Sequence, residues 1–169
     1  MAGDVGISIK DEAITRARLH DTAMYTATGE LSLQHAVPLY KDVTLTAAQL
    51  DTLNATPITC IAAPGAGKVI VVDQVYGFLD YNSAAYAGTS ETLAIRYTDG
   101  SGDIICQFTE ATFIEATADA YEIPAMIQVF PVVNSPVVAH ATADLTTGDS
   151  PIYLRIYYRI LTAAVNGTP

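Results

Sequence analysis

The clearest alternation of apolar and polar residues lies near the C-terminal end of the chain, in PIYLRIYYRIL (151–161). A strand has a side-chain period of two, so one set of residues would face a core, namely Ile152, Leu154, Ile156, Tyr158 and Ile160. The residues between them would share the other face, namely Tyr153, Arg155, Tyr157 and Arg159. The alternation leaves open whether this second face meets water or a partner.

Further apolar runs of strand length predict a chain built mainly of β-strands. They are AVPLYKDVTL (36–45), ITCIAAP (58–64), KVIVVDQVYGFLDY (68–81), ETLAIRYTDGSGDIICQF (91–108, two strands and a turn) and AMIQVFPVV (125–133). Pro131 would place the last of these at an edge or a bulge. We expect a loop at 81–90, a short helix or irregular crossing at 110–124, and a short strand followed by a loop at 135–151.

Residues 47–53 are the best helix candidate, within LTAAQLDTLNATP. Thr46 can cap the first turn, and Gln49 stands three residues later, which completes a capping box. Leu45 and Leu50 have the spacing of a hydrophobic staple across that cap. The pattern predicts a helix of about two turns.

Seven or eight strands with one short helix, and no alternation of strands with helices, predict an antiparallel arrangement. The expected fold class is therefore all-β, an antiparallel, jelly-roll-like β-sandwich with one short helix. The sandwich would span 36–169. Residues 1–35 have no clear period, and we interpret them as an extended N-terminal arm or lead-in.

Composition adds a constraint on how this sandwich is covered. Hydrophobic residues make up 50% of the chain and charged residues only 15%, against about 25% charged in ordinary soluble domains. A thin polar coat favours burial against further copies or a larger partner. A surface rich in threonine, serine and asparagine is the alternative, and both can hold.

The formal net charge is −10, and within 42–154 the only basic residues are Lys68 and Arg96. Nucleic-acid binding needs a basic stripe, and an anionic membrane surface also needs positive charge. Both partners are therefore disfavoured. The apolar runs are too short to span a membrane, and 1–30 lacks the apolar core of a secretion signal.

The stretch AAPGAGKVIVV (62–72) has two glycines and a lysine, like a phosphate-binding loop. That motif requires a glycine at Ala62 and a serine or threonine at Val69, and it must open a helix. The residues after Lys68 are β-branched and favour a strand. We interpret the stretch as a turn that leads into a buried strand.

The stretch DGSGDIICQFTE (99–110) imitates a calcium loop, because oxygen donors stand at Asp99, Ser101, Asp103 and Glu110. The glycine required at the sixth position is Ile104, and no helices flank the stretch. A hairpin turn with hydrated acids is the favoured interpretation, and an ion site is the alternative.

No local spacing supports catalysis or a metal. The three histidines, His20, His35 and His140, are far apart in the sequence, and no serine-hydrolase elbow or zinc motif occurs. Cys60 and Cys106 lie in strand-like runs, which favours two buried thiols, with a disulfide as the alternative. We assign no catalytic, cofactor-binding or metal-binding residue.

Several short pieces, VTLTAAQL, PGAGK with its apolar strand, LDY with AAYA, IRY and the closing SPIYLRIYYRIL, resemble a group of tailed-bacteriophage virion proteins. The similarity covers 43–97 and the last strand. It implies a structural protein attached to the head as a decoration or cement protein, with no catalytic residues.

We therefore expect a virion protein, assembled in the host cytoplasm, that forms a homotrimer on the capsid exterior and binds the major capsid protein. The alternatives are a tail, vertex or receptor-binding component, or an enzyme with a pocket of convergent acids or histidines. Arginine and tyrosine are favoured at protein interfaces. The candidate interface residues are Lys10, Arg16, Arg18, Tyr153, Arg155, Tyr157 and Arg159.

Overall fold

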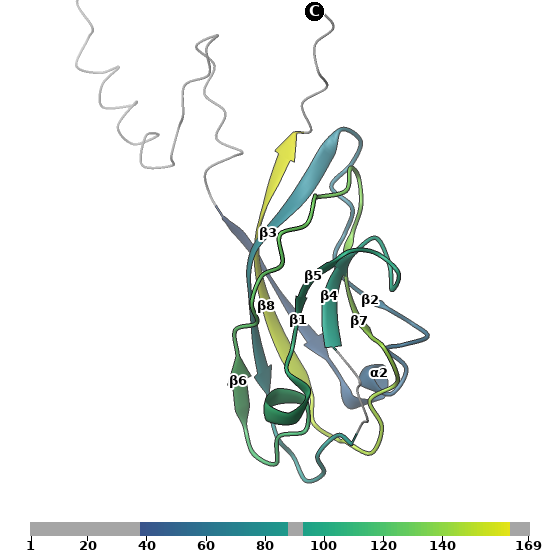
Figure 1. Cartoon of the computed structure of the whole chain (residues 1–169), viewed down its shortest axis with the longest axis vertical. Coiled ribbons are helices and arrows are strands. Elements are labelled where there is room, and N and C mark those ends of the chain that lie inside the picture. The colour runs from purple at the N-terminus through teal and green to yellow at the C-terminus, as the bar shows by residue number, and fades with distance from the viewer. Residues whose placement is uncertain (1–37, 88–92, 163–169) are drawn as a thin grey trace, which may run out of the picture. The chain divides into compact units, whose positions relative to one another are not determined.

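The computed structural model describes residues 38–87 and 93–162, which form two four-stranded sheets (Figure 1). The first sheet has the order β1 (Leu39–Leu45), β8 (Ile152–Thr162), β3 (Lys68–Leu79) and β6 (Ala120–Glu122). The second has the order β2 (Ile58–Ile61), β7 (Val137–Ala141), β4 (Leu93–Tyr97) and β5 (Ile104–Gln107). Every pair of neighbouring strands is antiparallel, so the predicted all-β sandwich is confirmed.

The strands pair in a nested order: β1 with β8, β2 with β7, β3 with β6, and β4 with β5. Successive nested pairs belong to alternate sheets, so the β4–β5 hairpin is the only direct connection between described strands that stays within one sheet. A long antiparallel ribbon that is rolled up produces this order, which is the jelly-roll-like arrangement. The predicted hairpin across 99–102 forms the closed end of that ribbon.

A single apolar core is shared by the two sheets, because one face of each strand is buried. In β8 the predicted alternation holds for Ile152, Leu154 and Ile156, whose side chains are almost completely buried. Tyr158 and Ile160 are only half-buried, contrary to the expectation for the core face. The reason is length: at about 3.3 Å per residue, an eleven-residue strand extends beyond the five-residue β7 of the opposite sheet.

The predicted helix is present but shorter. α2 (Ala47–Leu50) begins with the expected capping box: Gln49 N donates to Thr46 Oγ1 at 3.3 Å, and Thr46 N donates to Gln49 Oε1 at 3.0 Å. Leu45 and Leu50, the predicted staple, are both fully buried. The helix ends three residues earlier than the predicted Leu53, and the chain continues in turns.

The prediction of a strand at 125–133 is wrong. This stretch has isolated bridges only at Met126, opposite Cys106, and at Val133, opposite Val69. Proline cannot donate to a sheet, and Pro131 lies inside the run. The stretch 110–124 before it contains a single turn of π-helix, η2 (Glu110–Ile114), as the short-helix alternative predicts, and also the strand β6, which was not predicted.

The turn interpretation of PGAGK is confirmed. Gly65 and Gly67 have φ angles of +98° and +70°, a region that favours glycine. Lys68 N donates to Gly65 O at 3.2 Å, and β3 begins at Lys68 rather than a helix. Gly65 N is bonded to the Asn134 side chain at 3.0 Å, so this amide is used within the fold.

One aspartate, Asp149, holds the loop that follows β3 through several hydrogen bonds. The Asp149 carboxylate accepts from Ser83 Oγ at 2.6 Å, from Ala84 N at 2.9 Å and from Ser83 N at 3.1 Å. These hydrogen bonds stabilise the ionised form, so the pKa of Asp149 is lowered to about 2.

We predict that Asp149 stabilises the fold above about pH 4 and that this contribution is lost as the pH falls towards 2. The pKa of Asp149 is lower in the folded chain than in the unfolded chain, so acid favours unfolding. An Asp149→Asn variant should melt at a lower temperature than the natural chain at pH 7, and the gap should narrow as the pH falls from about 4 to 2. A gap that is constant from pH 7 to pH 2 would contradict this role. Thermal unfolding followed by circular dichroism measures it.

Candidate functional site

The outward face of the first sheet brings together side chains from all four strands. Register places Tyr157 between Tyr40 of β1 and Gln74 of β3. Two residues earlier on β8, Arg155 lies between Asp42 and Tyr76. Two residues before that, Tyr153 lies between Thr44 and Phe78. Phe78 in turn pairs with Tyr121 of β6. We call this surface the aromatic face; its rings are Tyr40, Tyr76, Phe78, Tyr121, Tyr153 and Tyr157.

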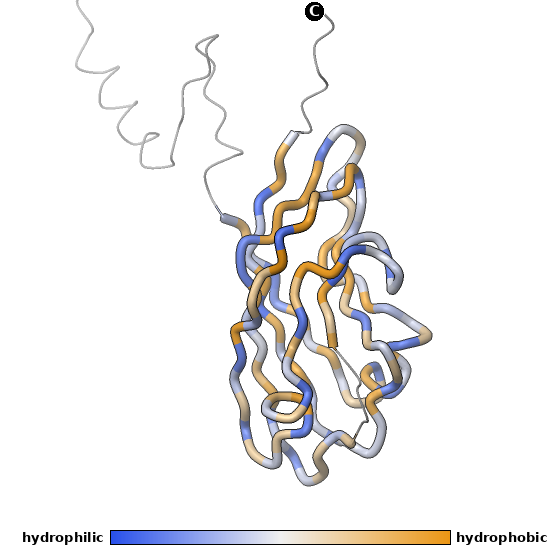
Figure 2. The backbone as a smooth tube through the Cα atoms, in the orientation of Figure 1, coloured by the Kyte–Doolittle hydropathy of each residue, from blue (hydrophilic) through white to orange (hydrophobic). Residues whose placement is uncertain are grey.

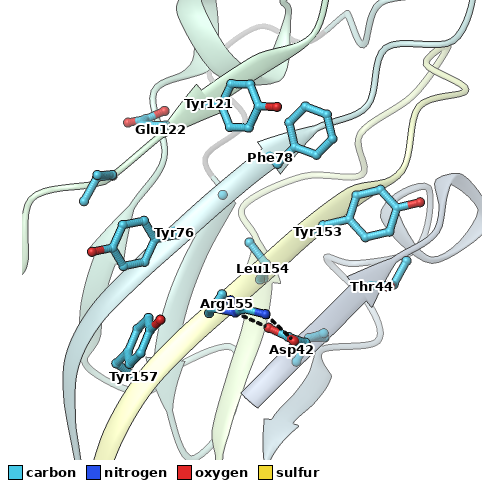
Figure 3. A pocket seen from close by; sticks show the side chains of 13 residues that line it. Asp42, Thr44, Tyr76, Phe78, Tyr121, Glu122, Tyr153, Leu154, Arg155 and Tyr157 are labelled. Carbon is cyan, nitrogen blue, oxygen red and sulfur yellow. Dashed lines mark hydrogen bonds and ion pairs between the residues drawn. The ribbon is translucent and has the colours of Figure 1, made fainter. Parts of the chain in front are cut away.

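The rings of the aromatic face contact one another across the strands. Phe78 stacks on Tyr121 with ring centroids 4.4 Å apart and lies 6.1 Å from Tyr153. Tyr157 lies edge-on to Tyr76 at 5.7 Å and tilted against Tyr40 at 6.1 Å. Rings at these distances attract one another, so the face holds a defined shape (Figure 3).

Two arginines of β8 lie on this face, each held by an aspartate. Arg155 donates from Nε and Nη2 to the two oxygens of Asp42 at 2.7 and 2.8 Å, and its guanidinium lies 4.9 Å from the centroid of Tyr40. The hydrogen bond from Arg155 lowers the pKa of Asp42. Arg159 donates to Asp73 at 2.6 Å. The positive charges are therefore neutralised within the face and their positions are set before any partner arrives.

The aspartate that holds Arg159 comes from a β-bulge. Val72 of β3 pairs with Tyr158 and Gln74 pairs with Tyr157, so Asp73 is the extra residue between them. A bulge leaves its extra residue without a partner in the ladder and redirects its side chain. Here that side chain reaches the neighbouring strand and accepts the Arg159 guanidinium.

Side chains of the aromatic face line an open hollow of about 760 Å³. Its lining combines the rings Tyr76, Phe78, Tyr121, Tyr153 and Tyr157 with the Asp42–Arg155 pair, and with Thr44, Glu122 and Ile123 at the margins. Figure 3 shows these side chains standing out from the sheet. The most exposed ring of the aromatic face is Tyr121, at 79%. A surface of this kind suits protein recognition, because rigid rings bury much area at little cost in conformational entropy.

The candidate interface residues of the sequence analysis fall into two groups. Tyr153, Arg155, Tyr157 and Arg159 lie on one face, as the alternation predicts, and Lys10, Arg16 and Arg18 lie outside the described residues. The sequence analysis missed Tyr40, Tyr76, Phe78 and Tyr121. The spacing of Tyr76 and Phe78 in VYGFL was an available signal, because residues two apart in a strand share a face.

The histidine, the cysteines and the acidic turn singled out in the sequence lie on different elements of the described fold. No group of three or more histidine, cysteine or acidic side chains there could hold a metal ion. Asp99 accepts from Ser101 N and Oγ at 2.8 and 2.7 Å, and β5 carries the chain away before Glu110. Residues 99–103 form the hairpin turn between β4 and β5.

Cys60 and Cys106 are free, buried thiols on the two outer strands of the second sheet, and burial raises the pKa of each to about 12. His140 is the histidine within the described residues, and burial next to Arg96 lowers its pKa. In the described part of the chain, no helix has the length and apolarity needed to cross a bilayer.

Comparison with known proteins identifies similar chains only among solved structures. No protein-family model matches the chain, and no curated protein matches it. A chain of the cyanophage Pam1 capsid asymmetric unit is similar at 16% identity and a TM-score of 0.43, over 82% of this chain and 94% of that one. A chain of the capsid of Ralstonia phage GP4 is similar at 15% identity and a TM-score of 0.34, over 74% of this chain and 85% of that one.

Proposed function

We propose that this protein is a structural component of a tailed-phage virion that binds the outside of the head and stabilises it as a decoration protein. The aromatic face carries this proposal. A patch of mutually packed rings with two paired arginines is exposed on a chain that has few charged residues to cover its surface. The resemblance of the sequence to phage virion proteins supports a phage head as the particle to which it binds.

The mechanism is adhesion rather than chemistry. Contact with the major capsid protein would remove the exposed rings from water, and apolar area buried in this way contributes about 25 cal/mol per Å² before the costs of association. A ligand that binds the assembled shell but not its separated subunits raises the free energy of opening the shell.

The acidic composition and the N-terminal arm fit the same proposed assembly. The acidic composition, with a net charge of −10, suits a position outside the shell and away from packaged DNA. We propose that the protein acts as a homotrimer and that the N-terminal arm, with Lys10, Arg16 and Arg18, reaches a neighbouring subunit.

The test is binding to expanded, empty phage shells that lack the protein. We expect the purified chain to bind and to raise the temperature at which the shells open. At a free concentration of about one hundred times Kd, each bound site is stabilised by about 2.7 kcal/mol. Differential scanning calorimetry and cosedimentation measure both effects. Saturating protein without any gain in shell stability would exclude a decoration role, and a few copies per native particle would indicate a tail or vertex component.

A further inference from the structure

A second exposed apolar surface lies in the connection between β6 and β7, next to the aromatic face, whose hollow is also lined by its first residue, Ile123. We call the residues Ile123–Val133 the apolar run. Five of its side chains are large, hydrophobic and exposed, namely Ile123, Ile127, Phe130, Val132 and Val133. Phe130 is 91% exposed, more than any other large hydrophobic side chain of the described residues. The tube in Figure 2 is mostly orange along this run.

The apolar run is attached to the sandwich at its middle and just past its C-terminal end. Ile127 N donates to Ile105 O at 2.7 Å, and Asn134 N, just past the run, donates to Lys68 O at 2.8 Å. Met126 and Val129 are partly buried against the core. The run therefore presents its exposed side chains from a supported backbone, and the intramolecular core does not account for them.

The apolar run is also free of charge. No acidic or basic residue occurs from Ile123 to Pro136, in a chain whose net charge is −10. Two copies of such a chain repel each other, and the repulsion is strongest where acidic side chains approach within a Debye length, about 8 Å at physiological salt. Near a rotation axis each residue also approaches its own copies, so a charged residue there would meet the same charge.

We propose that the apolar run is the surface through which copies of this chain associate with one another, with Phe130 at its centre. It is uncharged and apolar, so it complements itself without charge pairing. The aromatic face differs, because it has charges of both signs and suits a different protein. The inference rests on the proposed function and extends it, by assigning self-association to a surface that adjoins the one that binds the shell and shares only Ile123 with its hollow.

The test is the mass of the full chain in solution, without any phage shell, so its outcome is independent of shell binding. We expect sedimentation velocity to show an oligomer for the natural chain at micromolar concentrations. Higher salt should strengthen association, because it screens the repulsion between acidic copies while leaving the apolar contact intact. Phe130→Asp should weaken self-association at least tenfold, to an order of magnitude consistent with loss of a central buried aromatic residue.

Tyr40→Asp is the matched control, since it places the same charge at a 60% exposed ring on β1, outside the apolar run. It should leave the oligomer intact. Val132→Asp is a second variant within the run and should act like Phe130→Asp, with circular dichroism confirming that each variant is folded. A natural chain of monomeric mass at 100 times these concentrations would overturn the proposal, as would variants of the run that remain fully associated or a control that dissociates equally.

Discussion

A variant with alanine at both Tyr76 and Tyr157 is expected to bind phage shells about a hundredfold more weakly than the natural chain. These two rings meet edge-on at 5.7 Å, and both line the hollow of the aromatic face. Truncation would remove two anchors from the middle of the contact, one of which, Tyr76, is the cross-strand neighbour of Arg155. Because the two residues touch, their losses will not be additive.

The matched control for this variant has phenylalanine at the same two positions. It keeps the rings and removes only the hydroxyl groups, so it should bind within a few fold of the natural chain if ring burial dominates. Cosedimentation with shells over a range of protein concentrations gives both affinities. A folded double-alanine variant that binds as tightly as the natural chain would disprove the role of the aromatic face.

A Gly77→Val variant is expected to lose about 3 kcal/mol of unfolding free energy. Gly77 lies between Tyr76 and Phe78 in β3, so its missing side chain would point into the core. A Cβ there would overlap the ring of Phe108 and lie 2.9 Å from Cζ of Phe113. These two rings stack at 4.9 Å and are almost completely buried, so neither has free space into which it can move.

Urea unfolding at one protein concentration measures this loss as a lower midpoint with an unchanged slope. Gly77→Ala should lie between the natural chain and Gly77→Val. Adding Phe108→Leu should lower the free energy of unfolding less in the Gly77→Val background than in the natural chain, because the smaller side chain relieves the overlap. Equal costs of Phe108→Leu in the two backgrounds would show that crowding at Gly77 is not the cause.

The two predictions test opposite faces of the first sheet, and they meet at β3. Tyr76 and Phe78 point outwards into the hollow, and Gly77 between them makes room for Phe108 on the inner side. An outward face with large rings and an inward face with no side chain is a consequence of the two-residue period of a strand. A substitution at Gly77 therefore tests the core, and substitutions on either side of it test the surface.

Local features of the fold could be predicted from the sequence alone, because they depend on residues close together in the chain. The capping box at Thr46 and Gln49, the glycine turn before Lys68 and the alternation in β8 each follow from the preferences of a few adjacent residues. The absence of a helical period elsewhere was enough to indicate an antiparallel sandwich.

The tertiary structure decided which residues meet across strands, and this depends on pairings between distant parts of the chain. Tyr40, Tyr76 and Tyr157 gather because β1, β3 and β8 are neighbours in one sheet, and the bulge at Asp73 sets which rows align. Pairing between distant segments also decides the structure of the run 125–133, whose apolar residues resemble a strand in the sequence. Prolines interrupt a continuous ladder there, and much of the apolar surface of the run stays exposed.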